Sequence, residues 1–271
     1  MERPKLEFKE EHAAGSGLYI RVDEVLYTGR SDYQDIFIFR NEFWGTVFVL
    51  DGLVMMTERD EYFYHEALVH PPMVFAERTD RVLLIGGGDG GSVREILKYS
   101  PREVEVAEID AKVVEVARRF LPTGKYLDAP NVKVDITDGA RKVKVSRGYD
   151  VIVVDSTDPV GPAKVLFTRE FLGDVREALS DGGVVGMQVG SPMFYGEQVR
   201  ETYAVLGELF EDVRFYVSFT PTYPSGMWGF LLASKGELKF RREVKGDNRL
   251  LHTEDDIRAL LSLGRGYLRV I

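Results

Sequence analysis

The amino-acid sequence predicts an α/β fold: a Rossmann-like, doubly wound and mostly parallel sheet with a small N-terminal β-domain. Two observations carry this prediction. From Arg81 onward, short apolar runs alternate with segments of helical periodicity, the pattern of a parallel sheet covered on both faces. Before that point, apolar and polar residues alternate, which indicates strands with one buried face. We therefore expect a β-strand domain at residues 1–70 and a Rossmann-like domain at residues 71–271.

The first part of the chain has the composition and the turn signals of antiparallel strands. Residues 17–30 and 34–57 are rich in aromatic and β-branched side chains, which favour strands. Inside the second stretch, the segment from Asn41 to Gly45 and the pair Asp51–Gly52 are typical of hairpin turns. These turns predict consecutive strands that pair with one another.

The next part of the chain begins with a helix and then alternates strands with helices. Thr57 or Asp60 would cap the first helix, and Pro71 and Pro72 would end it. The strands expected after it are residues 81–88, 103–110, 131–138, 149–156 and 182–190. The helices expected around them are residues 91–100, 111–121, 168–180 and 195–210.

The last part of the chain departs from this alternation. Residues 213–224 and 227–234 are apolar runs too close together for an intervening helix, so they predict an antiparallel pair at the sheet edge. Residues 252–264 form an amphipathic pattern with Thr253 as its cap. We expect that helix to pack on the domain or on another subunit.

Composition narrows the class of protein. The 271 residues are 44% hydrophobic and carry a net charge of −9, which disfavours nucleic acid as a partner and suits cationic small molecules. The absence of cysteine excludes disulfides, thiolate metal sites and cysteine nucleophiles. We find no signal peptide and no membrane-length apolar run, so we expect a cytoplasmic protein with no membrane partner. Only three Asn and three Gln beside 29% charged residues indicate a heat-stable protein of thermophile type.

A glycine-rich segment, LLIGGGDGGSVREIL, predicts a ligand site. Gly86, Gly88 and Gly91 have GxGxxG spacing between an expected strand and an expected helix. Glycines there let the backbone approach a ligand at the start of the helix. About twenty residues further on, Glu108 or Asp110 ends the next strand, where an acid can bond a ribose hydroxyl.

Two ligand classes suit this loop: a dinucleotide such as NAD, or an adenosyl sulfonium such as S-adenosylmethionine or a derivative. Asp89 lies where a pyrophosphate would sit, and its charge opposes that anion but attracts a sulfonium ligand. In ITDGA, Asp138 precedes Gly139 and can accept a hydrogen bond from the adenine amine. Four expected strands end in an acid: Asp89, Glu108, Asp138 and Asp155. This alignment of negative charges favours a cationic adenosyl ligand.

Five segments in this order carry a resemblance to a known family: LDGLVMMTERDEYFYHEALVHPP, VLLIGGGDGGSVREILKY, VAEIDAKVVEVARRFLP, DVIVVDSTDPVGPAKVLFT and PTYPSGMWGF. From about Gln34 to Lys235 the chain resembles the polyamine aminopropyltransferases, the spermidine synthase family. The resemblance implies a methyltransferase-type fold and transfer of the aminopropyl group of decarboxylated S-adenosylmethionine to a polyamine amine, with release of methylthioadenosine. It also implies a homodimer or homotetramer. A sulfonium is already a good leaving group, so we expect no metal and no further cofactor.

The resemblance also implies roles for individual residues. Asp155 matches the general base, with Tyr64 and Tyr223 orienting the acceptor nitrogen. The residues that would bind decarboxylated S-adenosylmethionine are Gln34, His65, Asp89, Glu108, Asp138 and Gly139, beside the loop glycines Gly86 and Gly88. The residues that would line the acceptor site are Asp158, Gln188, Met55 and Trp228. The loop at residues 155–165 is expected to close over bound ligands.

One position departs from the family pattern. In the pattern DGxxQxTERDE, this chain has Met55 where the family often has glutamine. The exchange removes a polar contact and adds flexible apolar bulk, so agmatine or a longer polyamine is a plausible acceptor in place of putrescine. Met227 and Trp228 would shape an apolar channel for methylene chains. Met55 as a simple packing residue is the alternative.

Other functions stay open at this point. A methyltransferase would use intact S-adenosylmethionine, and a non-catalytic relative would bind a polyamine or an adenosyl ligand as a sensor. An NAD oxidoreductase is disfavoured by Asp89. A zinc site at HEALVH is also disfavoured, since His65 and His70 are five residues apart and fall on different helix faces. His12 and His252 have no partner pattern and are expected at the surface.

Overall fold

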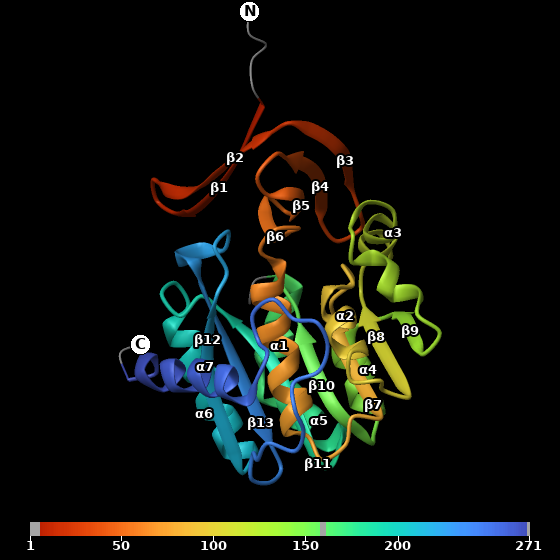
Figure 1. Cartoon of the computed structure of the whole chain (residues 1–271), viewed down its shortest axis with the longest axis vertical. Coiled ribbons are helices and arrows are strands. Elements are labelled where there is room, and N and C mark those ends of the chain that lie inside the picture. The colour runs from red at the N-terminus through yellow and green to blue at the C-terminus, as the bar shows by residue number, and fades with distance from the viewer. Residues whose placement is uncertain (1–5, 158–160, 270–271) are drawn as a thin grey trace, which may run out of the picture.

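The computed structural model describes residues 6–157 and 161–269 (Figure 1). The N-terminal strands lie at one end of the molecule, above a large sheet that holds most of the chain. Within the described ranges, no helix combines the length and the apolar character that crossing a bilayer requires.

The N-terminal part consists of antiparallel strands, as the turn signals predict. A hairpin of β1 (Leu6–Ala13) and β2 (Ser16–Val22) precedes a four-stranded sheet in which neighbours in sequence pair. That sheet contains β3 (Glu24–Arg30), β4 (Asp35–Asn41), β5 (Gly45–Leu50) and β6 (Leu53–Thr57). Asp51 and Gly52 have φ of 48° and 81°, the positive values that a tight two-residue hairpin turn requires.

The large sheet in the described part of the chain has seven strands in the order β12-β13-β11-β10-β7-β8-β9. Five of them run parallel: β7 (Arg81–Gly86), β8 (Glu103–Glu108), β9 (Val132–Ile136), β10 (Tyr149–Asp155) and β11 (Leu179–Gly190). The other two pair antiparallel with each other, as predicted: β12 (Asp212–Phe219) and β13 (Met227–Ser234). β13 also pairs antiparallel with β11, so it alone runs against the other described strands of this sheet. The chain proceeds outward from β7 to β9 and then restarts at β10 on the other side of β7. Ligands bind at such a switch point in this class of fold.

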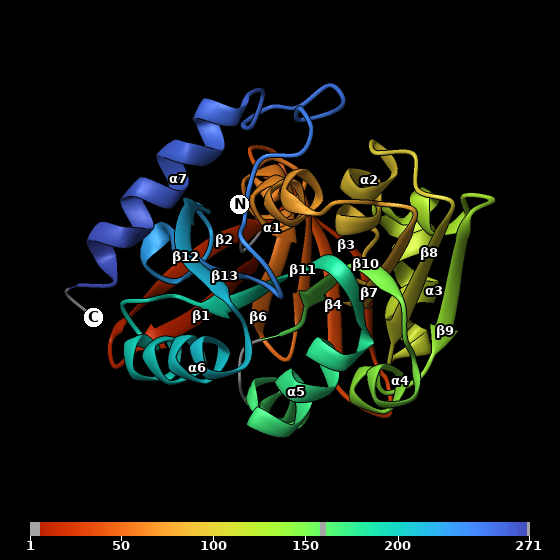
Figure 2. The same cartoon turned by 90° about the horizontal axis from the view of Figure 1, so that it is seen from below.

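Helices cover both faces of the large sheet, which confirms the doubly wound prediction (Figure 2). One buried core includes side chains of α1 (Glu61–Phe75), α2 (Gly91–Leu97), α3 (Ala111–Phe120) and α7 (Glu254–Tyr267). A second core, on the other face, includes α4 (Gly139–Val145), α5 (Arg169–Ala178) and α6 (Gly196–Leu209). Sequence analysis did not predict α4. The connections include short 3₁₀ turns at Gly124–Asp128, Gly161–Phe167 and Pro224–Gly226.

Helix α1 corrects the predicted ending at the two prolines. The helix continues through Pro71 and Pro72 to Phe75. A Cβ atom added to Gly186 on β11 would lie 2.7 Å from the Pro72 ring, so proline and glycine pack directly against each other. This burial of the ring outweighs the intrinsic cost of proline in a helix. The boundary predicted at residue 70 falls inside α1, and the division into residues 1–70 and 71–271 stays a prediction.

The start of α1 also differs from expectation. Asp60 occupies the N-cap position, but its side chain makes no capping bond. One carboxylate oxygen instead accepts from the Thr57 hydroxyl at 2.6 Å, and the other accepts from the backbone and hydroxyl of Thr222 at 3.0 and 2.7 Å. Asp60 therefore ties α1 to the turn that carries Tyr223. In contrast, Thr253 caps α7 with a full capping box, as predicted.

The segment before α7 is fastened to α1 by one carboxylate. Glu66 is 1% exposed. One of its oxygens accepts from the Arg249 N–H at 2.7 Å, and the other accepts from Leu250 and Leu251 at 2.9 and 2.8 Å. Three backbone donors that no helix or sheet satisfies thus share one buried anion.

Replacing Glu66 with alanine would leave these three donors without their acceptor. We expect Glu66→Ala to lower the free energy of unfolding by at least about 3 kcal/mol, since hydrogen bonds to charged groups contribute about 1.5–3 kcal/mol each. Chemical denaturation would measure the loss. Glu201→Ala, at an exposed position on α6, is the matched control and should change stability by less than about 0.5 kcal/mol. Equal effects of the two variants would contradict this role.

Candidate active site

The strand ends bring the predicted acids to one edge of the large sheet. Asp155 ends β10 and Glu108 ends β8, while Asp89 lies in the loop between β7 and α2. Since these strands are parallel, their carboxyl ends meet beside the switch point between β7 and β10. The ends of these strands point toward the N-terminal strands (Figure 1).

The glycines of the loop leave room for the groups of the site. A Cβ atom on Gly86, which has a φ of 81°, would lie 1.9 Å from the Asp155 backbone oxygen. A Cβ on Gly88 would lie 2.8 Å from a Glu108 carboxylate oxygen. One on Gly91 would lie 2.2 Å from the His65 ring. Each glycine is therefore required by a different neighbour, and together they allow strand, loop and helix to converge.

Asp155 is a buried carboxylate with a hydroxyl on each oxygen. Tyr64 donates to Oδ1 at 2.7 Å, and Ser92 donates to Oδ2 at 2.6 Å. Burial raises the pKa of Asp155, and the nearby charge of Asp89 raises it further. The His65 cation and the two hydroxyls oppose this shift without cancelling it, so the pKa stays above its ordinary value. A carboxyl with a raised pKa is a stronger base than a solvated one.

His65 lies between two carboxylates. Its Nδ1 is 2.6 Å from Glu61 Oε2, and its Nε2 is 3.6 Å from Asp89 Oδ1. Burial on its own lowers the pKa of the imidazole, but Asp89 and Glu61 together raise it well above the ordinary value. Arg94 donates two bonds of 2.7 and 2.8 Å to Glu61. Burial raises the pKa of Glu61, but His65, followed by Arg94, lowers it to about 2. His65 is therefore a cation held in a fixed orientation.

Three of these groups form a compact cluster. Among the described residues, His65, Asp89 and Asp155 are the one set of His, Asp and Glu groups whose nitrogen and oxygen atoms all lie within 4.8 Å of one another. With two carboxylates against one imidazole, the cluster suits a cationic nitrogen. We assign no metal ion to it, and the predicted absence of metal stays a prediction.

Glu108, at the end of β8, contacts the glycine loop. Its two oxygens accept from the backbone N–H groups of Gly88 and Asp110, at 3.1 and 2.9 Å. Burial raises the pKa of Glu108 to about 7 despite these two bonds. The group thus changes charge near neutral pH, and donors from a ligand would favour its ionised form.

The remaining residues predicted to bind the adenosyl ligand have structural partners. Gln34 donates to Asp110 Oδ2 at 2.9 Å, and Ser31 donates to the same oxygen at 2.6 Å. Asp110 thereby joins the β3–β4 connection to the start of α3. Asp138 caps α4 by accepting from the Ala140 backbone N–H at 2.8 Å. Asp138 and Gly139 therefore lie at the start of α4, shortly after β9 ends at Ile136.

A second group of predicted residues surrounds a cavity of about 40 Å³ next to Asp155. Trp228 donates from its indole to Gln188 at 3.0 Å. Gln188 in turn donates to the backbone oxygens of Ser156 and Thr157, at 3.0 Å each. It therefore fixes the first residues after Asp155 at the end of β10. The residues that line the cavity are Glu10, Leu53, Val54, Met55, Tyr64, Ser156, Thr157, Tyr223, Pro224 and Trp228.

The structure thus brings Met55, Tyr64, Tyr223 and Trp228 together, and the Tyr223 hydroxyl donates to the Met55 backbone oxygen. Asp158 lies within residues 158–160, which are outside the described residues. These residues are also part of the loop at residues 155–165 that is predicted to close over ligands.

Sequence analysis missed four residues of this region: Glu10, Glu61, Ser92 and Arg94. Glu10 is 5% exposed, accepts from the Val54 N–H at 2.7 Å and lies 2.9 Å from the His12 ring. His12 is accordingly a partly covered partner of Glu10, which corrects its prediction as a surface residue, whereas His252 is exposed as predicted. Nothing in the charged stretch around Glu10 distinguishes it in the sequence. Ser92 and Arg94 lie in the glycine-rich motif, and that motif was the available signal.

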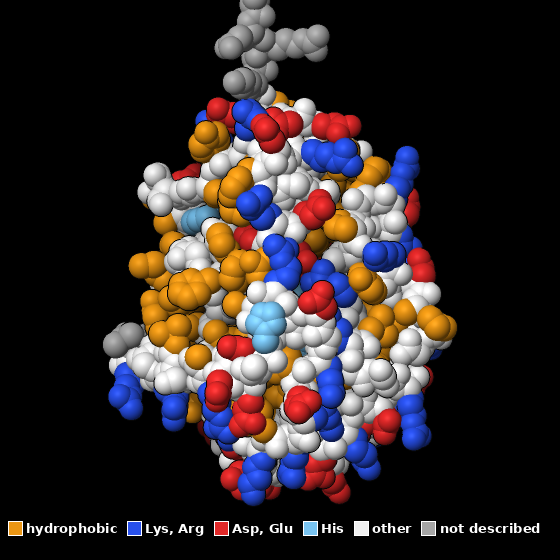
Figure 3. Space-filling view, viewed as in Figure 1, with side chains coloured by type: hydrophobic (Ala, Val, Ile, Leu, Met, Phe, Trp, Pro, Cys, Tyr) orange, Lys and Arg blue, Asp and Glu red, His pale blue; other side chains and the backbone are white. Residues whose placement is uncertain are grey.

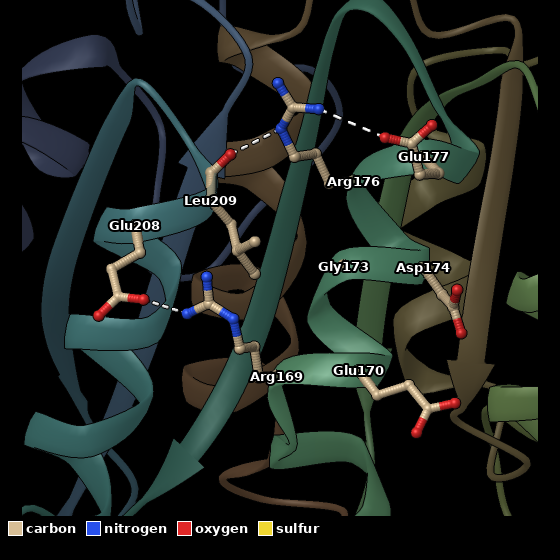
Figure 4. Close-up of a pocket in the computed structure, with 8 residues that line it drawn as sticks. All are labelled: Arg169, Glu170, Gly173, Asp174, Arg176, Glu177, Glu208 and Leu209. Atoms are coloured by element: carbon tan, nitrogen blue, oxygen red, sulfur yellow. Dashed lines mark hydrogen bonds and ion pairs between the residues drawn. The ribbon is translucent and has the colours of Figure 1, made fainter.

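A larger hollow lies elsewhere, between α5 and α6, and measures about 660 Å³ (Figure 4). Arg169 pairs with Glu208 there, and Arg176 donates to the Leu209 backbone oxygen at 2.6 Å. Its lining consists of Arg169, Glu170, Gly173, Asp174, Arg176, Glu177, Glu208 and Leu209, and it includes none of the described site residues. Both of its arginines already have partners, so size alone does not mark the site.

Comparison with known proteins decides the family. The profile described as "Spermine/spermidine synthase domain" matches residues 61–242, and the one described as "Spermidine synthase tetramerisation domain" matches residues 7–58. This chain belongs to the spermine/spermidine synthase family. The resemblance read from the sequence is therefore confirmed. As a member of this family, the chain is a transferase of aminopropyl groups, and the methyltransferase and non-catalytic alternatives are not favoured.

Relatives in the spermine/spermidine synthase family match over most of their length. The polyamine aminopropyltransferase of Clostridium perfringens is 44% identical over 236 residues, covering 85% of this chain and 83% of that protein. The one of Thermoplasma acidophilum is 39% identical over 237 residues, covering 86% and 87%. A spermidine synthase solved with the transition-state analogue AdoDATO has a TM-score of 0.91 at 36% identity, covering 100% and 97%. Spermidine synthase from Thermotoga maritima has a TM-score of 0.87 at 34% identity, covering 100% and 96%. These likenesses confirm the predicted fold.

The charged contact between Glu61 and His65 is open to a direct test. Glu61→Gln keeps the side-chain size but removes the negative charge. The pKa of the His65 imidazole should then fall, because Asp89 is left as the one carboxylate named above that opposes the effect of burial on His65. Nuclear magnetic resonance of the ring protons across pH would measure the fall, with the exposed Glu197→Gln as control.

The same contact has a consequence for stability. In the wild type, the pKa of His65 is raised in the folded protein, so protonation of its imidazole stabilises the fold. This stabilisation is complete at pH values below the pKa of His65 in the unfolded chain. It is lost as the pH rises through the pKa of His65 in the folded protein. Glu61→Gln should weaken that pH dependence. An unchanged His65 titration would contradict the role given to Glu61.

Proposed function

We propose that this chain transfers the aminopropyl group of decarboxylated S-adenosylmethionine to a primary amine of a polyamine, with Asp155 as the general base. One observation carries the proposal: the buried carboxylate of Asp155 belongs to a cluster suited to a cationic nitrogen, and its hydrogen-bond partner Tyr64 also lines a small cavity. A base that adjoins both the cluster's other acid and the cavity fits a reaction that joins an amine to a sulfonium ligand.

The donor binds across the glycine loop in this proposal. Glu108 accepts the ribose hydroxyls, and Asp138 with Gly139 holds the adenine. Asp89 pairs with the ammonium of the aminopropyl arm, near His65. Gln34 orders this end by fixing Asp110. The AdoDATO complex of a relative, described as a transition-state analogue, supports a site that accommodates a reacting pair.

The acceptor occupies the cavity beside Asp155. Its ammonium gives a proton to the Asp155 carboxylate, which leaves a neutral amine and a carboxylic acid. The nitrogen lone pair then bonds to the methylene carbon next to sulfur, and the carbon–sulfur bond breaks with its electron pair moving to sulfur. Methylthioadenosine leaves as a neutral molecule, and the new secondary amine carries the positive charge that sulfur has lost. The Tyr64 and Tyr223 hydroxyls orient the attacking nitrogen.

The cavity walls bear on the choice of acceptor. Met55 and Trp228 offer apolar contact to methylene groups, and Glu10 places a buried carboxylate at the same cavity. A second cationic group on the acceptor would meet that carboxylate, so an amine with charge at both ends is favoured. Putrescine, agmatine and longer polyamines all carry such charges, and it is the apolar Met55 that favours agmatine or a longer polyamine over putrescine.

The proposal also includes the oligomeric state and the heat stability of the protein. The N-terminal match to a tetramerisation domain supports a homodimer or homotetramer. Figure 3 shows hydrophobic side chains gathered on the side where Figure 1 places β12 and α7, and Tyr19, Phe219 and Leu263 are large exposed apolar residues. Heat stability fits the Asn- and Gln-poor composition and the Thermoplasma relative. A cytoplasmic location, and the absence of nucleic-acid and membrane partners, stay predictions.

The deciding experiment supplies decarboxylated S-adenosylmethionine with putrescine, agmatine and spermidine in separate reactions. Mass spectrometry would identify the products, and we expect an amine heavier by one aminopropyl group together with methylthioadenosine. Intact S-adenosylmethionine in a parallel reaction tests methyl transfer. Release of no methylthioadenosine with any amine would overturn the proposal.

Removal of the base should have a large effect. Asp155→Asn keeps the shape but accepts no proton from the acceptor, so turnover should fall by at least about 100-fold, a typical contribution of a general base. Steady-state release of methylthioadenosine measures it. Asp181→Asn, an exposed acid in β11, is the control and should turn over normally. Near-normal turnover of Asp155→Asn would reject the assignment.

The acceptor preference should respond to Met55. Met55→Gln adds a polar group to the cavity wall, so the ratio of kcat/KM for putrescine to that for spermidine should rise about tenfold, the worth of one hydrogen bond. Competition between the two amines in one reaction would measure the ratio. An unchanged ratio would mean that Met55 only packs.

A further inference from the structure

Ser92 belongs to the glycine-rich segment, and the transfer chemistry above gives it no part. It lies in α2, directly after Gly91, and its side chain is fully buried. Its hydroxyl oxygen is 2.6 Å from Asp155 Oδ2, whereas Tyr64 contacts Oδ1. An ionised carboxylate only accepts hydrogen bonds, so both hydroxyls must donate to Asp155.

We propose that Ser92 is a positioning residue for aminopropyl transfer: its hydroxyl holds Asp155 in the charged form and in the rotation that takes the acceptor's proton. The inference rests on the proposed function, in which Asp155 is the base.

Geometry supports this role first. The last torsion of an aspartate is broad, so a single donor leaves the plane of the carboxylate free to turn. Here Tyr64 on α1 and Ser92 on α2 each hold one oxygen, and the carboxylate at the end of β10 is clamped between two helices. Each oxygen keeps a second acceptor position, and that position remains available to the incoming ammonium.

The charges around Asp155 support it independently. The groups that face it are Tyr64 and His65 from α1, Asp89 from the β7–α2 loop, and Ser92 from α2. Burial and Asp89 favour the neutral acid, whereas His65 and the two hydroxyls favour the carboxylate. Because an acid that already holds a proton is no base, each donor extends the pH range in which Asp155 can act.

The test compares Ser92→Ala with the wild type by two measurements. The first is the pH dependence of kcat/KM for the acceptor amine at saturating donor. The second is the ionisation of Asp155 in the ligand-free protein, read from its carboxyl signal by carbon-13 nuclear magnetic resonance, with Asp155→Asn to identify the signal. We expect the acid limb and the Asp155 titration to move up together by about one to two pH units, the effect of losing one donor to a charged group. The activity lost by Ser92→Ala should shrink as pH rises.

Two further variants separate positioning from packing. Ser92→Thr keeps a hydroxyl and should restore both measurements toward the wild type. Ser234→Ala removes a buried hydroxyl that contacts the Gly183 backbone oxygen at 3.3 Å, and it should change neither. If Ser92→Ala titrates like the wild type in both measurements, the inference is overturned. A shifted Asp155 titration in a protein whose wild type transfers no aminopropyl group would support the Ser92 contact and overturn the proposed function instead.

Discussion

The burial of several negative charges at one sheet edge is the constraint on which the rest of the structure depends. Asp89, Glu108 and Asp155 converge where β7, β8 and β10 end, and each loses the water that would stabilise its charge. Compensation must come from nearby groups: the His65 cation, backbone N–H groups of the loop, and two hydroxyls. The glycines make this convergence sterically possible. Loop, helix and strand are consequently fixed relative to one another by electrostatics as well as by packing.

Helix α1 connects this edge to the rest of the molecule. Tyr64 and His65 face the acids, whereas Glu66 holds the segment at residues 249–251. One turn further, His70 lies 2.8 Å from the Tyr99 hydroxyl and 3.0 Å from Glu95 Oε2, so it belongs to a buried network of its own. The same helix therefore positions groups of the candidate site on one side and is itself held in place on the other. Hydrogen bonds of this kind, away from the site itself, keep the side chains of a site in a fixed geometry.

Much of the fold was predictable because period and turn chemistry are local properties. The alternating strands and helices, the antiparallel last pair and the Thr253 cap follow from patterns within a few residues. The continuation of α1 through Pro72 was not predictable, because it depends on Gly186 more than one hundred residues away. The candidate site divides in the same way. Motifs indicate Asp89, Glu108 and Asp155, but the importance of Glu10 and Glu61 arises only from what folding brings beside them. The roles of all these residues rest on the proposed chemistry.

The cavity near Asp155 depends on the N-terminal strands. Glu10 and Met55 come from β1 and β6, in a part of the chain whose strands share a small core of their own: Ile20, Val22, Phe39, Val47, Val49 and Val54. Other side chains of these strands belong to the core that contains α1, α2 and α3: Ile36, Ile38, Phe48, Leu50 and Met56. The cavity wall and the sheet edge at Asp155 are therefore coupled through this shared core. A mutation in the N-terminal strands that changes the proposed acceptor preference is constrained by the packing that also supports the proposed base.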